Sequence, residues 1–214
     1  MAEYIEQAGP PDPRQKPILV RPKATLAQAE ARLRAERVPV DATLALLRKH
    51  EGFKSKPYRD SKKLWTIGIG TKIGDGSDAA LAASKYRGTE ISEADALALA
   101  KKDMLAKAEL AASADQLGPV FNELAPETLA QVVSGYYRGD LSGSPKTKAL
   151  LRERKFGEAA KEFLNSAEYK AEKEKKSGVA GRMEEIAAAL RAEQKRREPA
   201  SFQQAVENRL SQVR

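Results

Sequence analysis

Residues 50–71 read H-E-G-F-K-S-K-P-Y-R-D-S-K-K-L-W-T-I-G-I-G-T, and the rest of the chain can be placed around them. The stretch has a glutamate at the end of an apolar helical pattern, Glu51. An aspartate follows at an expected hairpin turn, Asp60, and then a threonine in a short strand pattern, Thr66. Each residue alone is more often structural than catalytic. Because local chain geometry would bring two carboxylates and a hydroxyl together, we expect an acid/base site here.

The segment before this stretch predicts a helix that delivers Glu51. Asp41 is the expected N-cap, and Leu44 and Leu47 mark the buried face. Gly52 follows Glu51 at the position where a left-handed C-cap is usual. A carboxylate at a helix C-terminus lies near the negative end of the helix dipole, which favours its protonated form. Proton donation by Glu51 would profit from this.

After Gly52 the pattern changes to that of a hairpin. Tyr58 belongs to one predicted strand, residues 60–63 to the turn and residues 64–69 to the next strand. Alternation places residues 65, 67 and 69 on one face of that strand and residues 64, 66 and 68 on the other. Residues 71–88 are expected to be irregular. Within them G-D-G-S-D, at 74–78, resembles part of a calcium loop but lacks its later glutamate, so a glycine-rich turn is the better interpretation.

Everything after residue 91 predicts helices. Ser92 and Asp95 have capping spacing for a long one, and Pro126 stands at a favoured first-turn position of the next. Shorter helices are expected around 146–154, 157–165 and 180–191, with the charged run 170–176 as a solvated connection. The tail shows helical spacing again after Pro199. It could pack on the domain, pair with another chain or lie on a membrane, and protein contacts are the favoured interpretation.

These patterns divide the chain into four parts. Residues 1–24 hold five prolines and predict an extended arm. Residues 25–40 predict a helical linker, because Thr25 and Gln28 have the spacing of a capping box. Residues 41–192 form the expected domain, with a β lobe at about 52–88 and a helical lobe at about 91–192. Residues 193–214 form a basic amphipathic tail.

Composition limits the chemistry. The 214 residues are 41% hydrophobic and 32% charged, with no cysteine and one histidine. This excludes disulfides and thiolate zinc sites and leaves little room for a Ser-His-Asp triad. Any catalysis must therefore rest on carboxylates and hydroxyls. The net charge of +8 has two interpretations. The basic surface could serve to bind a polyanionic partner, or the lysines and arginines simply keep the outer faces of the helices in contact with water. No nucleic-acid-binding motif, secretion signal or apolar run of about 20 residues is seen, so we expect no specific nucleic acid and no transmembrane segment.

The pattern Glu-x8-Asp-x5-Thr, with the words E-G, Y-x-D and W-T-I-G-I-G, closely resembles the phage-type lysozymes of glycoside hydrolase family twenty-four. The likeness continues more weakly through I-S-E-A-D-A, K-T-K-A-L-L-R-E-R-K-F-G-E-A-A and G-V-A-G-R, and covers about residues 41–192. It implies an α+β, predominantly helical fold in which a small β-hairpin lobe and a larger helical lobe flank a cleft.

The resemblance also implies roles. Glu51 matches the family's general acid, Asp60 its second carboxylate and Thr66 the hydroxyl that helps hold the attacking water. No metal or cofactor is implied. Three further residues fall at substrate-side positions: Tyr137, Thr147 and Glu162.

Two positions depart from the family. Thr71 stands where a histidine is common, so we expect the polar contact that this histidine makes to be absent. Tyr137 stands where an amide side chain often lines the cleft, and it could stack on a sugar ring or belong to the core.

The expected activity is hydrolysis of the β-1,4 bond between N-acetylmuramic acid and N-acetylglucosamine in peptidoglycan, with inversion. A lytic transglycosylase, or a virion structural protein that carries a lysozyme domain, is the alternative. The partners expected are peptidoglycan glycan strands, and phage virion proteins through the arm or the tail. A phage-encoded enzyme would wait in the host cytoplasm as an endolysin or travel in the virion.

Overall fold

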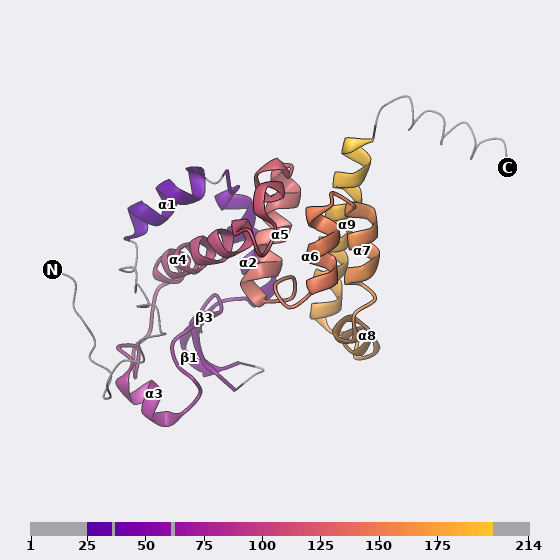
Figure 1. The fold of residues 1–214 in the computed structure, drawn as a ribbon. Coiled ribbons are helices and arrows are strands. Elements are labelled where there is room, and N and C mark those ends of the chain that lie inside the picture. The colour runs from indigo at the N-terminus through magenta and orange to yellow at the C-terminus, as the bar shows by residue number, and fades with distance from the viewer. Residues whose placement is uncertain (1–24, 36, 61–62, 199–214) are drawn as a thin grey trace, which may run out of the picture.

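The computed structural model describes residues 25–35, 37–60 and 63–198 (Figure 1). The predictions for the arm and for the tail helix after Pro199 lie outside these residues. The strands are β1 (Lys54–Arg59), β2 (Trp65–Gly68) and β3 (Thr71–Lys72). The helices are α1 (Leu26–Ala35), α2 (Val40–Glu51), α3 (Asp78–Ala83), α4 (Glu93–Ala112), the 3-10 helix η1 (Gly118–Glu123), α5 (Pro126–Arg138), α6 (Pro145–Arg152), α7 (Phe156–Phe163), α8 (Ala167–Glu174) and α9 (Gly178–Arg197). The predicted class, α+β and mainly helical, is confirmed.

The strands form an antiparallel sheet in the order β1-β2-β3. Tyr58 pairs with Thr66 across the first two strands. The turn between them is closed by Asp60, whose N–H donates to the Leu64 carbonyl and whose Oδ1 accepts from the Leu64 N–H, both at 2.9 Å. The hairpin is therefore as predicted. The third strand was not predicted, because a two-residue strand leaves no periodicity in the sequence.

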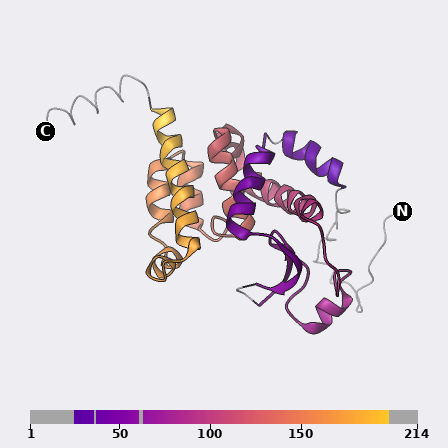
Figure 2. The same ribbon diagram turned by 180° about the vertical axis from the view of Figure 1, so that it is seen from behind.

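Helix α2 ends at Glu51 and turns directly into the sheet (Figure 2). Gly52 has φ +69°, a value that residues with a Cβ rarely adopt, so glycine makes the turn possible. The predicted N-cap was wrong. Pro39 takes that place and Asp41 lies in the first turn, where its charge still faces the positive end of the helix dipole.

The sheet packs on α4 through small residues. Gly68 has φ +67°, and a Cβ at this position would lie 3.0 Å from the Ala96 Cβ. The predicted capping box of α4 is present, with Ser92 and Asp95 each accepting from the other's N–H. Residues 66–69 are all buried, so β2 is covered on both faces rather than on the one that alternation implied.

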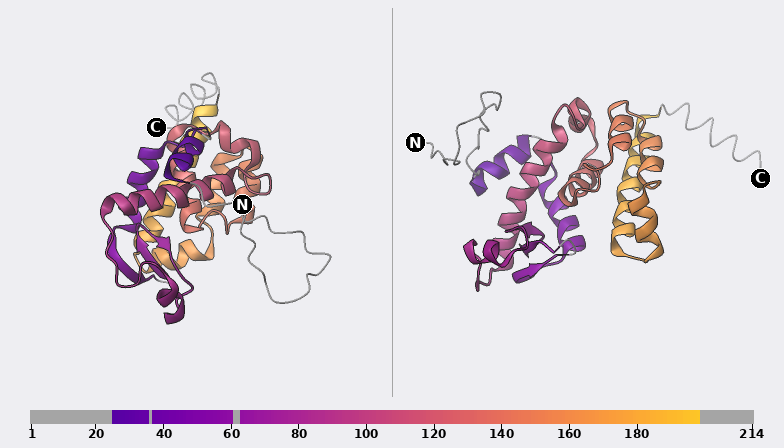
Figure 3. Two further views of the ribbon diagram at one scale, coloured as in Figure 1. Left: turned by 90° about the vertical axis from the view of Figure 1, so that its left-hand side faces the viewer. Right: turned by 60° about the horizontal axis from the view of Figure 1, so that its bottom comes forward.

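Helix α5 is central to the helical part, where it contacts α2, α4 and α9. It begins at Pro126 as predicted, and its buried side chains include Leu129, Val132, Val133 and Tyr136. Beyond α5, helices α6 to α9 lie together on the side away from α1, as the orange and yellow ribbons in Figures 1 and 3 show. The sheet lies at the lower end of this assembly in Figure 1.

Several segments differ from their prediction. The supposed irregular stretch 71–88 contains β3 and α3, and Ser77 caps α3 through a bond from the Ala80 N–H. The charged run 170–176 falls largely in helix α8, which buries no residue and so left no apolar stripe to detect. Helix α9 runs through the boundary proposed after residue 192 and continues to Arg197. In the proposed linker, Ala29 and Leu33 are fully buried in the core, and α1 packs on α4.

Candidate active site

A hollow between the sheet and the ends of α2 and α5 brings the predicted catalytic residues together. It is lined by Glu51, Tyr58, Asp60, Thr66, Gly70, Lys72, Tyr137 and Arg138. The residues from Glu51 to Lys72 come from consecutive segments at the start of the domain. Tyr137 and Arg138 come from α5. The structure therefore joins Glu51, Asp60, Thr66 and Tyr137 in one place.

Two of the predicted substrate-side residues are not part of this hollow. Thr147 lies in α6 with only 1% of its surface exposed. Glu162 is partly exposed on α7. Neither is among the residues that line the hollow in the described chain. Thr147 is therefore buried in the α6 region, and its place at the substrate stays a prediction, as does that of Glu162.

Glu51 is held by an arginine from the far end of the chain. Arg182 Nη1 in α9 donates to Glu51 Oε1 at 2.5 Å. The arginine side chain is 3% exposed and that of Glu51 is 23% exposed. A charge-assisted bond of this kind fixes the carboxylate more firmly than a neutral hydrogen bond would. Arg182 thus restrains the Oε1 atom of Glu51, while the side chain still lines the hollow.

Asp60 and Thr66 are positioned by the hairpin itself. One carboxylate oxygen of Asp60 accepts from the Leu64 N–H, which fixes the direction of the side chain. Thr66 is 2% exposed, and its hydroxyl donates to the Leu64 carbonyl at 3.3 Å. Because that bond uses the hydroxyl proton, the Thr66 oxygen keeps lone pairs with which to accept. The pair can therefore receive both protons of a bound water.

The two tyrosines of the hollow stay protonated. Tyr137 donates its hydroxyl proton to the Ile69 carbonyl at 2.7 Å, and burial, followed by the nearby charge of Asp103, raises its pKa. Burial also raises the pKa of Tyr58, and the carboxylates of Glu51 and Asp60 add to that rise. Both residues form walls of the hollow, and neither acts as a general acid at neutral pH.

Gly70 lies beside both Glu51 and Tyr137. A Cβ at Gly70 would lie 3.4 Å from Tyr137 Cε1 and 3.5 Å from Glu51 Cγ, and the backbone has φ +79°. Those distances are ordinary contacts, so the second glycine of the I-G-I-G motif is favoured by its backbone conformation rather than by lack of space.

Thr71, which stands where the family commonly has a histidine, makes a polar contact of its own. Thr71 is 7% exposed and its hydroxyl donates to Asp103 Oδ2 at 2.6 Å. The bond ties β3 to α4, because Thr71 is the first residue of β3 and Asp103 lies in α4. The sheet is therefore anchored to the helical part.

The histidine next to the glutamate faces away from the hollow's lining. His50 Nε2 lies 3.2 Å from Glu185 Oε2 in α9, and the side chain is 9% exposed. Burial lowers the pKa of His50, the charge of Arg182 lowers it further, and Glu185 opposes both. His50 thus belongs to the contact between α2 and α9.

Sequence reasoning missed two buried residues behind the hollow, Arg182 and Asp140. The word G-V-A-G-R contained Arg182, but nothing local showed that this arginine meets Glu51. Asp140 follows the glycine that ends α5 and is 6% exposed. In the described residues, no group of three or more His, Cys, Asp or Glu side chains is placed to hold a metal ion. Every helix in the described part of the chain is too short or too polar to span a bilayer.

A mainly helical domain with a small sheet and an acid-lined hollow between them is the arrangement of a lysozyme. The sequence model of the family described as phage lysozyme matches residues 48–185, which include the whole hollow. The chain belongs to the phage lysozyme family and is a peptidoglycan-hydrolysing lysozyme. No curated protein matches the chain.

Proposed function

We propose that the chain hydrolyses the β-1,4 bond between N-acetylmuramic acid and N-acetylglucosamine by a single displacement with inversion. One observation carries this proposal: Glu51, Asp60 and Thr66 line the same hollow from three different local elements. Two carboxyl groups, one to give a proton and one to activate water, are what this reaction requires.

Glu51 would act as the general acid. Departure of the sugar alkoxide needs a proton, and a positioned carboxyl group supplies it in the transition state. The side chain is mostly shielded and is fixed by Arg182, so it reaches the glycosidic oxygen from one direction. Tyr137 and Gly70 form the surface beside it.

Asp60 and Thr66 would place the attacking water. Asp60 accepts one of its protons and Thr66 the other, which leaves the water oxygen lone pair aimed at the anomeric carbon. The negative charge of Asp60 also stabilises the oxocarbenium-like transition state. The water attacks as the leaving oxygen departs, so configuration at the anomeric carbon inverts.

A lytic transglycosylase is the second candidate reaction. It needs an acid but no residues that hold water, because the sugar's own 6-hydroxyl closes onto the anomeric carbon. The Asp60–Thr66 pair favours hydrolysis, since a ring-closing enzyme has no use for it. The product decides: an anhydro sugar identifies the transglycosylase.

Delivery to the wall is also proposed. The enzyme would be phage-encoded and would act after release from the host cytoplasm or as a component of the virion, held there by residues 1–24 or by the tail at 193–214. Mass spectrometry of purified particles tests the virion route. A chain that is absent from the particles would remove it, together with the idea of a virion structural role.

The proposed reaction is tested by Glu51→Gln in a cell-wall lysis assay. We expect the lysis rate to fall at least about 100-fold, the low end for loss of a general acid. Glu158→Gln is the matched control, because Glu158 is exposed on α7, lies outside the hollow and should leave the rate near wild type. Circular dichroism confirms that both variants are folded. Equal lysis by wild type and Glu51→Gln would overturn the assignment.

A further inference from the structure

We propose that Lys72 is a specificity-determining residue, which binds a carboxylate of the peptide that is attached to muramic acid in the glycan strand. The inference rests on the proposed function, because it takes the substrate to be a strand of peptidoglycan. It adds a positive charge for substrate binding to a hollow whose predicted catalytic groups are two carboxyls and a hydroxyl.

Lys72 stands beside Thr66 on the face of the sheet that lines the hollow. In the register of the sheet, Thr66 pairs with Tyr58 of β1 on one side and with Lys72 of β3 on the other. Side chains of residues directly opposite each other in antiparallel strands lie on the same face. All three residues line the hollow. The row Tyr58–Thr66–Lys72 therefore crosses the sheet along one wall of the hollow, with the lysine at its β3 end.

The side chain of Lys72 has no partner, unlike the other basic side chains of the three strands. Lys56 and Arg59 each form an ion pair, with N···O distances of 2.7 and 2.9 Å. Lys54 Nζ lies 4.1 Å from the centroid of an aromatic ring, a cation–π contact. Lys72 is exposed, and within the described part of the chain its side chain makes no hydrogen bond or ion pair. Its ammonium group, on a flexible stem of four carbons, is thus free to meet a ligand in the hollow.

The second basic residue that lines the hollow already has partners. Arg138 Nε donates to Asp140 Oδ1 at 2.9 Å, and Arg138 Nη2 lies 3.8 Å from Glu168 Oε1. The arginine side chain is only 25% exposed. An anion of the substrate would have to compete with these carboxylates for Arg138, whereas Lys72 can bind it directly.

The charge of Lys72 is unfavourable for the proposed reaction unless the substrate supplies an anion. Positive charge develops on the sugar in the oxocarbenium-like transition state, and a like charge in the same hollow raises its energy. A carboxylate bound to Lys72 offsets that repulsion. In a strand that carries its peptides, the lactyl carboxyl of muramic acid is used in an amide bond, so the anions nearest to this sugar are the carboxylates of the peptide. Lys72 therefore favours peptide-bearing strands over uncharged glycans.

The test removes the charge from each side of the contact in turn. Calorimetry measures the Kd of soluble, uncrosslinked peptidoglycan strands for Glu51→Gln, and for the same variant carrying Lys72→Met as well. The same strands are then used with their carboxyl groups converted to methylamides. We expect Lys72→Met to raise the Kd for unmodified strands about fivefold, the upper end for an exposed ion pair. Methylamidated strands should bind more weakly, and equally to the two proteins.

Lys56→Met in the same background is the matched control, because Lys56 is an exposed lysine of the same sheet that pairs outside the hollow. It should keep the preference for unmodified strands, as should Lys72→Arg, which retains the charge. An equal rise of the Kd in Lys56→Met and Lys72→Met would overturn the inference, since any basic residue would then serve. Undiminished binding of methylamidated strands would also overturn it, because the anion would then be one that amidation leaves intact, such as a phosphodiester.

The binding experiment and the lysis assay fail separately. Binding is read in Glu51→Gln without any cleavage, so the preference for charged strands and its dependence on Lys72 report on the inference alone. Lysis that is absent in wild type, or equal in wild type and Glu51→Gln, overturns the proposed reaction instead.

Discussion

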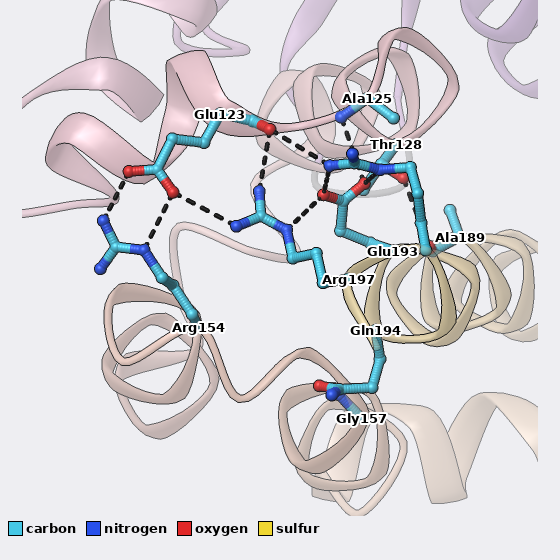
Figure 4. Close-up of polar contacts among 10 residues, drawn as sticks. Glu123, Ala125, Thr128, Arg154, Gly157, Ala189, Glu193, Gln194 and Arg197 are labelled. Carbon is cyan, nitrogen blue, oxygen red and sulfur yellow. Dashed lines mark hydrogen bonds and ion pairs between the residues drawn. The ribbon is translucent and has the colours of Figure 1, made fainter. Parts of the chain in front are cut away.

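The end of α9 is fixed by a buried glutamate, and Glu193→Ala should measure how strongly. Figure 4 shows Glu193 between Ala125, in the turn before α5, and Arg197 at the end of its own helix. Its carboxylate accepts from the Ala125 N–H at 3.1 Å and from Arg197 Nε at 2.7 Å. Arg196 contacts it as well. Glu123 completes the cluster by accepting from Arg154 Nε at 2.9 Å.

The expected loss of unfolding free energy is about 3 kcal/mol. The Ala125 N–H loses its partner in a partly buried place, which costs about 1 to 3 kcal/mol. The bond to Arg197 is charge-assisted and its loss costs about 1.5 kcal/mol, the low end because Arg197 keeps Glu123. Arg196 is half-exposed and contributes little, since water can replace the glutamate.

Urea unfolding followed by circular dichroism measures this loss, provided that the transition is two-state. Glu184→Ala is the matched control, because Glu184 belongs to the same helix and pairs with Lys173 while remaining 41% exposed. It should lose less than about 1 kcal/mol. Equal losses in the two variants would refute the reasoning, since burial would then have no effect.

Two further predictions concern the same structure. Gly68→Ala should lower the melting temperature by several degrees, because the backbone has φ +67° and the new Cβ would crowd Ala96; an unchanged temperature would mean that the sheet can move away from α4. Acid should weaken the contacts that Glu193 makes at the end of α9. Burial would raise the pKa of Glu193, but the bonds from Arg196, Arg197 and the Ala125 N–H lower it below the usual 4.5. Its contribution to stability is therefore present above that value and is lost as the pH falls below it. Urea midpoints measured from about pH 5 to about pH 3 should fall more steeply in wild type than in Glu193→Gln, and parallel curves would contradict this.

The hairpin and its three candidate residues could be predicted because their geometry is local. Glu51 ends a helix at a glycine, Asp60 closes its own turn, and Thr66 follows within the next strand. Such features depend on neighbours a few residues away, which the sequence displays directly. The long helices were predictable for a similar reason, since Ser92 and Pro126 mark where α4 and α5 begin.

What could not be predicted depends on contacts between distant segments. Arg182 meets Glu51 across 131 positions of the chain, and no spacing rule connects the two. Asp140 follows a glycine and carried no signal in the sequence, although its side chain is buried beside two arginines. The burial of Thr147 could not be predicted for the same reason, because it depends on the segments that pack around α6.

The central claim is that Glu51 protonates the leaving sugar while Asp60 and Thr66 deliver water. Digestion of purified peptidoglycan in oxygen-18 water, with the products followed at once by NMR and mass spectrometry, tests it most directly. The account predicts a reducing N-acetylmuramic acid end that carries one oxygen-18 atom and is released as the α-anomer. An anhydro end without the label, or release of the β-anomer, would contradict it.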